Sequence, residues 1–167
     1  MAVVNTKSTT ITNADATPIV KNSAGIDAGN LKVKVATVAV AAGDDDTSVF
    51  RFVRLPSNAV VHKIDLLNDA ITDGTDYDCG VYQTAANGGA VVLVNAWADA
   101  VSMASARVTP LDITHEAGGL AIENCYKKVY EVAGLTTDTG REYDLCLTGV
   151  TVGSAAGDIT LKVYYSV

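Results

Sequence analysis

The last ten residues, "DITLKVYYSV", repeat with a period of two. Ile159, Leu161, Val163, Tyr165 and Val167 share one parity, and polar or aromatic residues lie between them. Successive side chains of a β-strand point to opposite faces, so this alternation predicts a strand with one face on a hydrophobic core. Such a strand is stable only when other strands pair with it, and the rest of the chain must supply them.

Further strand patterns recur along the chain between turn signals. In residues 31–40 the apolar parity changes at Ala36-Thr37, which predicts a β-bulge or bend in that strand. The other predicted strands lie within residues 49–55, 59–69, 76–84, 91–94 and 142–152. Seven or eight short strands predict an all-β, mainly antiparallel fold, a jelly-roll-like β-sandwich formed by residues 31–167.

Two stretches depart from the period of two and favour helix. Residues 95–106 are predicted as a short helix or an irregular segment, with Asn95 as N-cap. Residues 122–133 are predicted as one amphipathic helix that buries a stripe against the sheets, with Gly134 as its stop. The stripe consists of Ile122, Cys125, Tyr126, Val129, Val132 and Ala133.

Residues 1–30 are rich in Thr, Ser, Asn, Ala and Asp and have little apolar periodicity. This composition predicts an extended N-terminal arm outside the core, either a floppy terminus or a segment that becomes ordered against a neighbouring subunit. In the second case, spaced apolar residues would anchor it to the partner. These predicted partner-binding residues are Val3, Val4, Ile11, Ile19 and Val20.

Charge and hydropathy exclude several classes of partner. The 167 residues contain 12 Lys and Arg against 19 Asp and Glu, a net charge of −7, with no basic run. Nucleic acid is therefore not an expected partner, because phosphate contacts need a cationic surface. The chain has neither a signal-peptide pattern nor 18 consecutive apolar residues, so we expect synthesis in the cytoplasm and no membrane insertion.

Residue types that carry chemistry are scattered rather than grouped. His62 and His115 have no partner at metal-ligand spacing and are predicted to be structural. Cys79, Cys125 and Cys146 have long, irregular spacings, which argues against a disulfide framework and favours buried free thiols. We therefore expect no cofactor and no enzymatic activity.

Acidic turns and a single Trp are the remaining candidates for ligand binding. Asp73, Asp76 and Asp78 lie close together, as do Asp44, Asp45 and Asp46. Calcium binds converging oxygen ligands, but turn residues whose side chains bond to their own backbone are the favoured interpretation. Carbohydrate binding usually needs exposed aromatic rings, and Trp97 is the candidate platform for that alternative.

Three stretches together resemble a known group of proteins. They are "RFVRLPSNAVVHKIDLLND", "DYDCGVYQT" with "NGGAVV", and "YKKVYEVAGLTTDTGREYDLCLTGVTVGSAAGDITLKVYYSV". Residues 31–167 resemble small head proteins of tailed bacteriophages, the capsid decoration or cement proteins. The resemblance implies a virion protein on the capsid exterior that bridges and stabilises major capsid protein subunits, in many copies and as a homo-oligomer. The alternative is a tail- or fibre-associated module that binds glycan.

Overall fold

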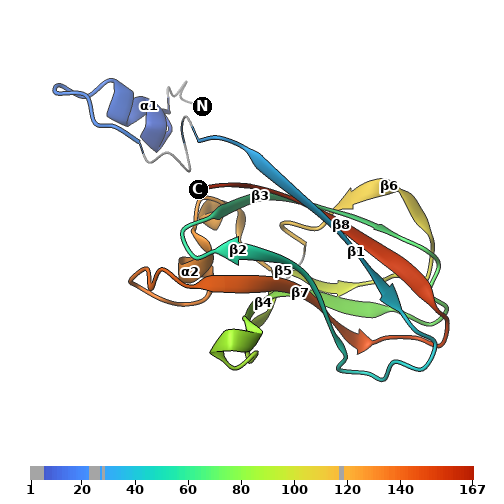
Figure 1. Cartoon of the computed structure of the whole chain (residues 1–167). Helices are drawn as coiled ribbons and strands as arrows, with labels where there is room; N and C mark the ends of the chain where they lie inside the picture. Colours follow the sequence, from blue (N-terminus) through green and yellow to red (C-terminus); the bar gives the residue numbers. More distant parts are fainter. Residues whose placement is uncertain (1–5, 23–26, 28, 117–118) are drawn as a thin grey trace.

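The computed structural model of the chain describes residues 6–22, 27, 29–116 and 119–167. Within them, eight strands form two four-stranded antiparallel sheets packed face to face (Figure 1). The first sheet has the order β1-β8-β3-β6 and consists of β1 (Lys32–Val40), β8 (Gly157–Ser166), β3 (Val60–Asn68) and β6 (Arg107–Asp112). The second has the order β2-β7-β4-β5 and consists of β2 (Val49–Pro56), β7 (Glu142–Thr151), β4 (Asp76–Gln83) and β5 (Val91–Val101).

The pairing of the strands follows one rule. β1 pairs with β8, β2 with β7, β3 with β6 and β4 with β5, as if one long antiparallel hairpin had been rolled into two sheets. Additional pairs β3–β8 and β4–β7 close each sheet into a continuous layer. This is jelly-roll connectivity, and the predicted all-β sandwich is confirmed.

The core lies between the two sheets. Ile159, Leu161 and Val163 of β8 are completely buried, as their alternation predicts. The ring of Tyr77 is also buried, and its hydroxyl donates a 2.7 Å hydrogen bond to the carbonyl of Val152. Each large apolar side chain removed from water in this way contributes about 1.5 to 3 kcal/mol to folding.

Strand β1 contradicts the predicted bulge at Ala36-Thr37. Its register with β8 runs without a shift from Lys32 opposite Tyr165 to Val40 opposite Gly157. Alternate residues from Ala36 to Val40 pack toward the core, whereas Val33 and Val35 point outward. Because both faces of β1 carry apolar residues, the sequence pattern resembles a change of parity although the strand is regular.

Residues 95–101 continue β5, so the predicted helix over 95–106 is wrong. Positions 79 and 81 of β4 face Ala98 and Leu93 of β5, so two steps along β4 correspond to five along β5. The extra residues cross over Gly80 so closely that a Cβ there would lie 2.1 Å from the carbonyl oxygen of Val94. The large bulge breaks the period of two, and Trp97 is buried beside it.

The predicted helix over 122–133 is two short pieces. They are a 3₁₀ turn, η2 (Ile122–Asn124), and one turn of α-helix, α2 (Val129–Val132). Lys128 forms an isolated bridge with Val60, and the amide of Val129 donates to the carbonyl of Ala59 at 2.8 Å. These long-range backbone bonds compete with a continuous helix. The stripe is split as a result: Val129 is buried, whereas Ile122, Cys125 and Tyr126 are exposed.

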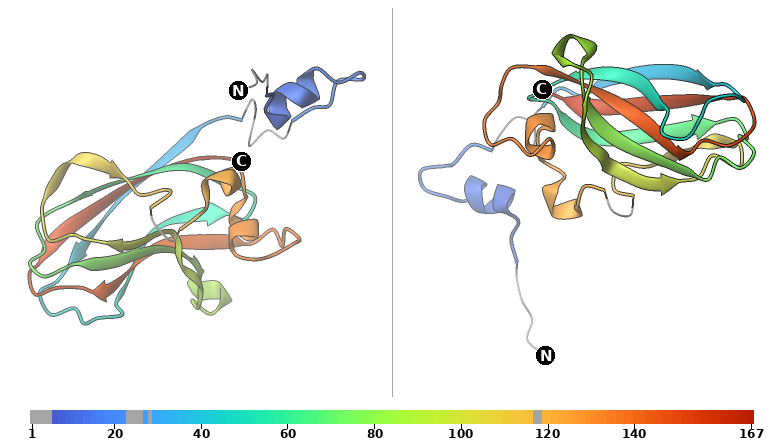
Figure 2. Two further views of the ribbon diagram at one scale, coloured as in Figure 1. Left: turned by 180° about the vertical axis from the view of Figure 1, so that it is seen from behind. Right: turned by 90° about the horizontal axis from the view of Figure 1, so that it is seen from below.

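The N-terminal segment is not extended throughout, contrary to prediction. It contains α1 (Thr9–Ala14), and Figures 1 and 2 show this helix off one end of the sandwich, apart from both sheets. A further 3₁₀ turn, η1 (Ala85–Asn87), lies between β4 and β5. Among the described residues, no helix combines the length and apolarity that crossing a bilayer requires.

Candidate interaction surface

The N-terminal arm folds locally on itself. Ser8 caps α1 by accepting a hydrogen bond from the amide of Ile11 at 3.3 Å, and Lys7 pairs with Asp15 at 2.8 Å. The chain then turns back, so that the amide of Val20 donates to the carbonyl of Asn13 at 3.1 Å. No residue of α1 is buried. The helix is therefore held by polar contacts, which leaves its apolar side chains free for other contacts.

Three of the predicted partner-binding residues lie in this described arm. Ile11, Ile19 and Val20 are 50%, 72% and 51% exposed. Val3 and Val4 lie outside the described residues. The arm brings Ile19 and Val20 to one small hollow, together with Ala14 and Asn22. That these residues bind a partner stays a prediction.

The outward face of β1 carries an apolar stripe that the sequence interpretation missed. Leu31, Val33 and Val35 are 61%, 51% and 61% exposed. β1 is an edge strand, so its free side is not covered by another strand of its sheet. The signal was present, because these residues have the parity opposite to Val38 and Val40, but both sets were assigned to the core. Regularly spaced exposed apolar residues on an edge strand are typical of a contact surface.

A polar cluster covers the outer face of the second sheet. The carboxylate of Asp144 is almost buried and binds Arg51 at 3.0 Å and Arg54 at 2.8 Å. This hydrogen bond and charge raise the pKa of Arg54. Arg51 also donates to the carbonyls of Gln83 and Gly89 and lies over the ring of Tyr82, 5.6 Å from its centroid. Its donors are used within the fold, so the cluster fastens the β4–β5 hairpin to β2 and β7.

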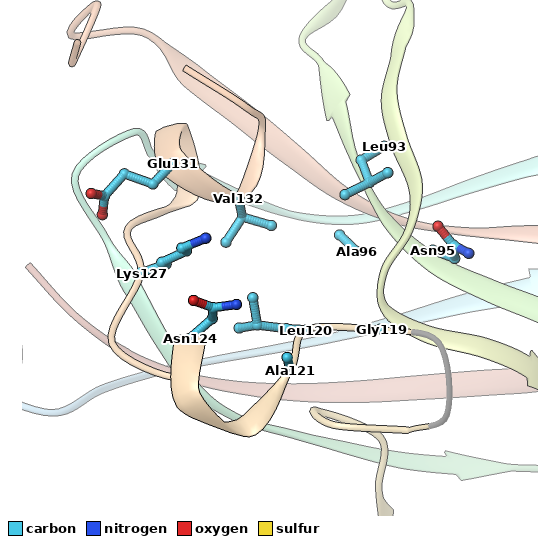
Figure 3. A pocket seen from close by; sticks show the side chains of 10 residues that line it. All are labelled: Leu93, Asn95, Ala96, Gly119, Leu120, Ala121, Asn124, Lys127, Glu131 and Val132. Atoms are coloured by element: carbon cyan, nitrogen blue, oxygen red, sulfur yellow. The ribbon is translucent and has the colours of Figure 1, made fainter. Parts of the chain in front are cut away.

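One cavity lies between β5 and the segment that contains η2 and α2. Its volume is about 300 Å³, and Figure 3 shows Leu93 and Ala96 of β5 across it from Val132 and Lys127. This volume is at the lower end for small-molecule sites. Most of the lining is apolar or amide, and its two ionisable side chains are Lys127 and Glu131, the second of which accepts from the amide of Lys128. The geometry gives the cavity no chemical role.

The acidic turns behave as structural turns. Asp44 accepts from the amide of Ala41 at 2.8 Å, and Asp46 accepts from the amide of Val152 at 3.0 Å. In the described parts of the chain, no group of three or more His, Cys, Asp or Glu residues could hold a metal ion. These side chains therefore order the backbone of their loops.

Asp78 differs from the other aspartates of the two acidic turn sequences because it is buried. Burial raises the pKa of its carboxyl group, and a hydrogen bond from the amide of Ala100 at 3.0 Å opposes that shift. Ala100 has a positive φ of 57°, which is uncommon for a residue with a Cβ. The carboxylate of Asp78 thus holds a strained part of β5 in place.

The histidines are not brought together with acidic partners. Nε2 of His62 lies 2.8 Å from the hydroxyl of Ser166, and Nδ1 of His115 lies 2.9 Å from the carbonyl of Leu120. His62 has the same sequence parity as Val60 and Ile64, which are buried. It is exposed instead, because β3 has a register shift between Val61 and Lys63.

All three cysteines are free thiols, and one of them contradicts the expectation of burial. Cys79 and Cys146 are buried, and burial raises the pKa of both thiols, to about 12 for Cys146. Cys125 is exposed, next to η2. The first two thiols are thus protected from reaction, whereas the third is accessible.

The glycan alternative loses the residue on which it depended. Trp97 is only 1% exposed, because its side chain belongs to the hydrophobic core, and the segment before η2 crosses its main chain. A Cβ at Gly119 would lie 2.1 Å from the carbonyl oxygen of Trp97, which shows how close this approach is. The indole ring is therefore not presented to a sugar.

The eight-stranded jelly roll defines a class of architecture found in viral capsid, lectin and cupin domains. No family model matches the sequence, and no curated protein is similar to it in sequence. Among solved structures, a chain of the Ralstonia phage GP4 capsid is similar with a TM-score of 0.60 and 14% identity, over 83% of this chain and 84% of that chain. A chain of the cyanophage Pam1 capsid asymmetric unit is similar with a TM-score of 0.52 and 20% identity, over 83% of this chain and 86% of that chain. At these identities the likeness establishes a shared fold.

Proposed function

We propose that the chain is a structural component of a tailed-phage head, a decoration protein that binds the capsid exterior and bridges neighbouring major capsid protein subunits. The observation that carries this proposal is the likeness to chains in two phage capsid structures, over more than four-fifths of each chain. The sequence resemblance over residues 31–167 points independently to the same group.

The surface of the molecule supports a role in contacts rather than in catalysis. The arm carries exposed Ile11, Ile19 and Val20, and the edge strand β1 carries exposed Val33 and Val35. Apolar side chains gathered on exposed segments favour association, because covering them removes apolar surface from water. An arm that projects from the sandwich can also reach a second subunit, which is the geometry that bridging requires.

The mechanism we propose is stabilisation by mass action. A protein that binds only the assembled shell shifts the equilibrium toward that shell, and many copies on a closed lattice add their contributions. We infer that the copies are arranged symmetrically, as homo-oligomers around capsid axes. Heads that lack the protein should therefore rupture at a lower temperature or a smaller osmotic shock than decorated heads.

Electron microscopy of the native particle tests the location. We expect density for the jelly roll on the outer shell, repeated with the lattice. Density restricted to the tail, or particles without this chain, would contradict the proposal.

Deletion of residues 1–28 tests the role of the arm. The core begins with Ala36, Val38 and Val40 of β1, so the truncated protein should keep its cooperative melt. Its affinity for undecorated heads should fall roughly tenfold or more, because several apolar anchors are lost. Full-length affinity in the truncated protein would show that the arm is a passive tail.

A further inference from the structure

The two ends of the sandwich differ in charge. We call residues 41–48, 69–76, 102–106 and 152–158 the acidic end; they are four connecting loops with the first residues of β4 and β8. Figures 1 and 2 show the strands that these loops connect meeting on the side away from α1. These loops contain seven aspartates and no Lys or Arg, namely Asp44, Asp45, Asp46, Asp69, Asp73, Asp76 and Asp158. The whole chain has 19 acidic and 12 basic residues, so the remainder has 12 of each. Arg107 borders these segments and donates to the carbonyl of Ser102, so the acidic end holds most, though not all, of the net negative charge of the chain.

The loops of the acidic end are bound to one another. Besides the bond from Val152 to Asp46, the amide of Asp158 donates to the carboxylate of Asp69 at 3.0 Å. Burial raises the pKa of the core residue Tyr77 to about 12, and the negative charges of Asp44 and Asp46 contribute to that shift. The acidic end is therefore a fixed negative surface.

The opposite end has the reverse character. We call this end, which surrounds the point where the arm joins β1, the arm end. It consists of residues 31–35, 56–60, 91–93, 119–141 and 166–167. It holds most of the exposed large apolar side chains of the sandwich, namely Leu31, Val33, Val35, Val91, Leu93, Ile122, Tyr126, Leu135 and Val167. By contrast, only Val49, Val108 and Val150 border the acidic end among the exposed large apolar residues of the described chain.

The arm end also has a small excess of positive charge. Its basic residues are Lys32, Lys34, Lys127, Lys128 and Arg141, and its acidic residues are Glu123, Glu131 and Asp138, with Glu142 bordering it opposite Pro56. Two of these acids are used inside the fold. Glu131 accepts from the amide of Lys128 at 2.8 Å, and Asp138 accepts from Ser57 and from the amide of Gly140.

We propose that the subunit docks through its arm end onto a protein surface that is apolar at its centre and acidic at its rim, with the acidic end pointing away from that surface. The inference rests on the proposed function, in which the partner is the capsid shell. Charged residues are depleted from the centres of protein interfaces and tolerated at their rims, and rim charges are complementary to those of the partner. The arm end fits this description, whereas the acidic end, with its seven aspartates, does not.

A second copy of the chain fits the arm end less well. Two arm ends facing each other would bring their excess Lys and Arg together. An arm end on the acidic end of another copy would match in charge, but its apolar residues would meet a surface with few exposed apolar partners. That head-to-tail contact would also generate an open filament rather than a closed shell.

The native cysteines provide a direct test. Cys125 lies on the arm end between exposed Ile122 and Tyr126, and it is the accessible thiol of the three. Its rate of maleimide labelling would be measured on the free protein and on protein bound to undecorated heads. We expect labelling to slow roughly tenfold or more on the heads, because a covered thiol reacts mainly from the dissociated protein.

A matched reporter at the other end serves as the control. In the double variant Cys125→Ala, Asp45→Cys, the accessible thiol moves to an exposed position of the acidic end. Its labelling should proceed at nearly the same rate on heads and in solution. If the wild-type protein does not co-sediment with heads, both the proposed function and this inference fail. If it co-sediments but Cys125 remains fully reactive, or if the thiol at position 45 becomes protected, the docking orientation alone is overturned.

Charge insertion gives a second, independent measurement. The variant Val33→Glu, Val35→Glu places two carboxylates on the exposed stripe of β1, and we expect head binding to weaken about tenfold or more. The control is Val150→Glu, at a residue that is similarly exposed but borders the acidic end. Both proteins should keep the wild-type melt. Equal loss of binding in the two variants would contradict docking through the arm end.

Discussion

Gly80 occupies the most crowded position in the second sheet, and its replacement by alanine should strongly destabilise the protein. A Cβ at this residue would lie 2.1 Å from the carbonyl oxygen of Val94 and 2.3 Å from that of Leu93. Real Cβ contacts essentially never fall below 3.0 Å, so the β5 backbone would have to move by at least about 0.9 Å.

The size of the destabilisation by Gly80→Ala depends on which atoms must move to make room for the Cβ. The atoms in the way are main-chain atoms of β5, which cannot rotate aside as a side chain would. Moving the bulge also loosens Trp97, which is buried beside it. Overpacking a core typically costs 1 to 3 kcal/mol, and we expect Gly80→Ala to lie at the upper end of that range, about 3 kcal/mol. For a domain of this size, that corresponds to a melting temperature lower by roughly 6 to 12 °C.

Thermal and urea denaturation, followed by circular dichroism, would measure this loss. Gly43→Ala is the matched control, because nothing lies within 4 Å of a Cβ at Gly43 in the loop between β1 and β2. The free energy of unfolding of this control should lie within about 1 kcal/mol of that of the wild type. If Gly80→Ala were as stable as the control, the close approach of β5 to β4 would be wrong.

Two further predictions concern the buried carboxylates. Asp144→Ala leaves Arg51 and Arg54 without their shared partner. Since both guanidinium groups are partly exposed, we expect the free energy of unfolding, measured by urea denaturation, to fall by about 1 to 3 kcal/mol, and this loss should persist at 1 M salt. A loss that salt abolishes would instead indicate a surface ion pair. Asp78→Asn removes a carboxyl whose pKa is raised by burial but keeps an acceptor for the amide of Ala100. A raised native pKa favours the protonated form, so the wild type loses stability as pH rises through that pKa; the variant should be more stable than the wild type at pH 7, and this advantage should shrink toward pH 3. An advantage that grows as pH falls would refute the sign of this argument.

The strands of the jelly roll were predictable where each strand buries one regular face. The alternation of Ile159, Leu161 and Val163 is a local property, and the core enforces it because a slip by one residue would turn every side chain to the other face. The sequence "ANGGA", which is typical of a hairpin connection, joins β4 and β5.

The errors arose where distant segments decide the backbone. The bulge of β5 depends on the room that Gly80 leaves on the neighbouring strand, and the interruption of the 122–133 helix depends on the bridge between Lys128 and Val60. Neither partner is near in sequence. Helical spacing alone could not distinguish a bulged strand or two short turns from a helix.

The surface was harder to predict than the fold. The exposure of Ile19 and Val20 agreed with their place in a polar segment, but the outward stripe of Leu31, Val33 and Val35 was assigned to the core. The inward and outward faces of this strand carry the same types of apolar residue. The register of β1 with β8 distinguishes them, because it places Ala36 and Val38 opposite the buried Leu161 and Ile159.

The pairing of β1 with β8 places the start of β1 and the end of β8 on the same side of the molecule. Lys32 lies opposite Tyr165, so the arm leaves the sandwich beside the C-terminus. A foreign sequence fused to either terminus would therefore be carried into the region that we propose to contact the shell. An insertion at the exposed Gly43, in the loop at residues 41–48, would instead extend from the opposite end, because nothing lies within 4 Å of a Cβ at that residue. For displaying cargo on a particle, this loop rather than a terminus is the suitable point of attachment.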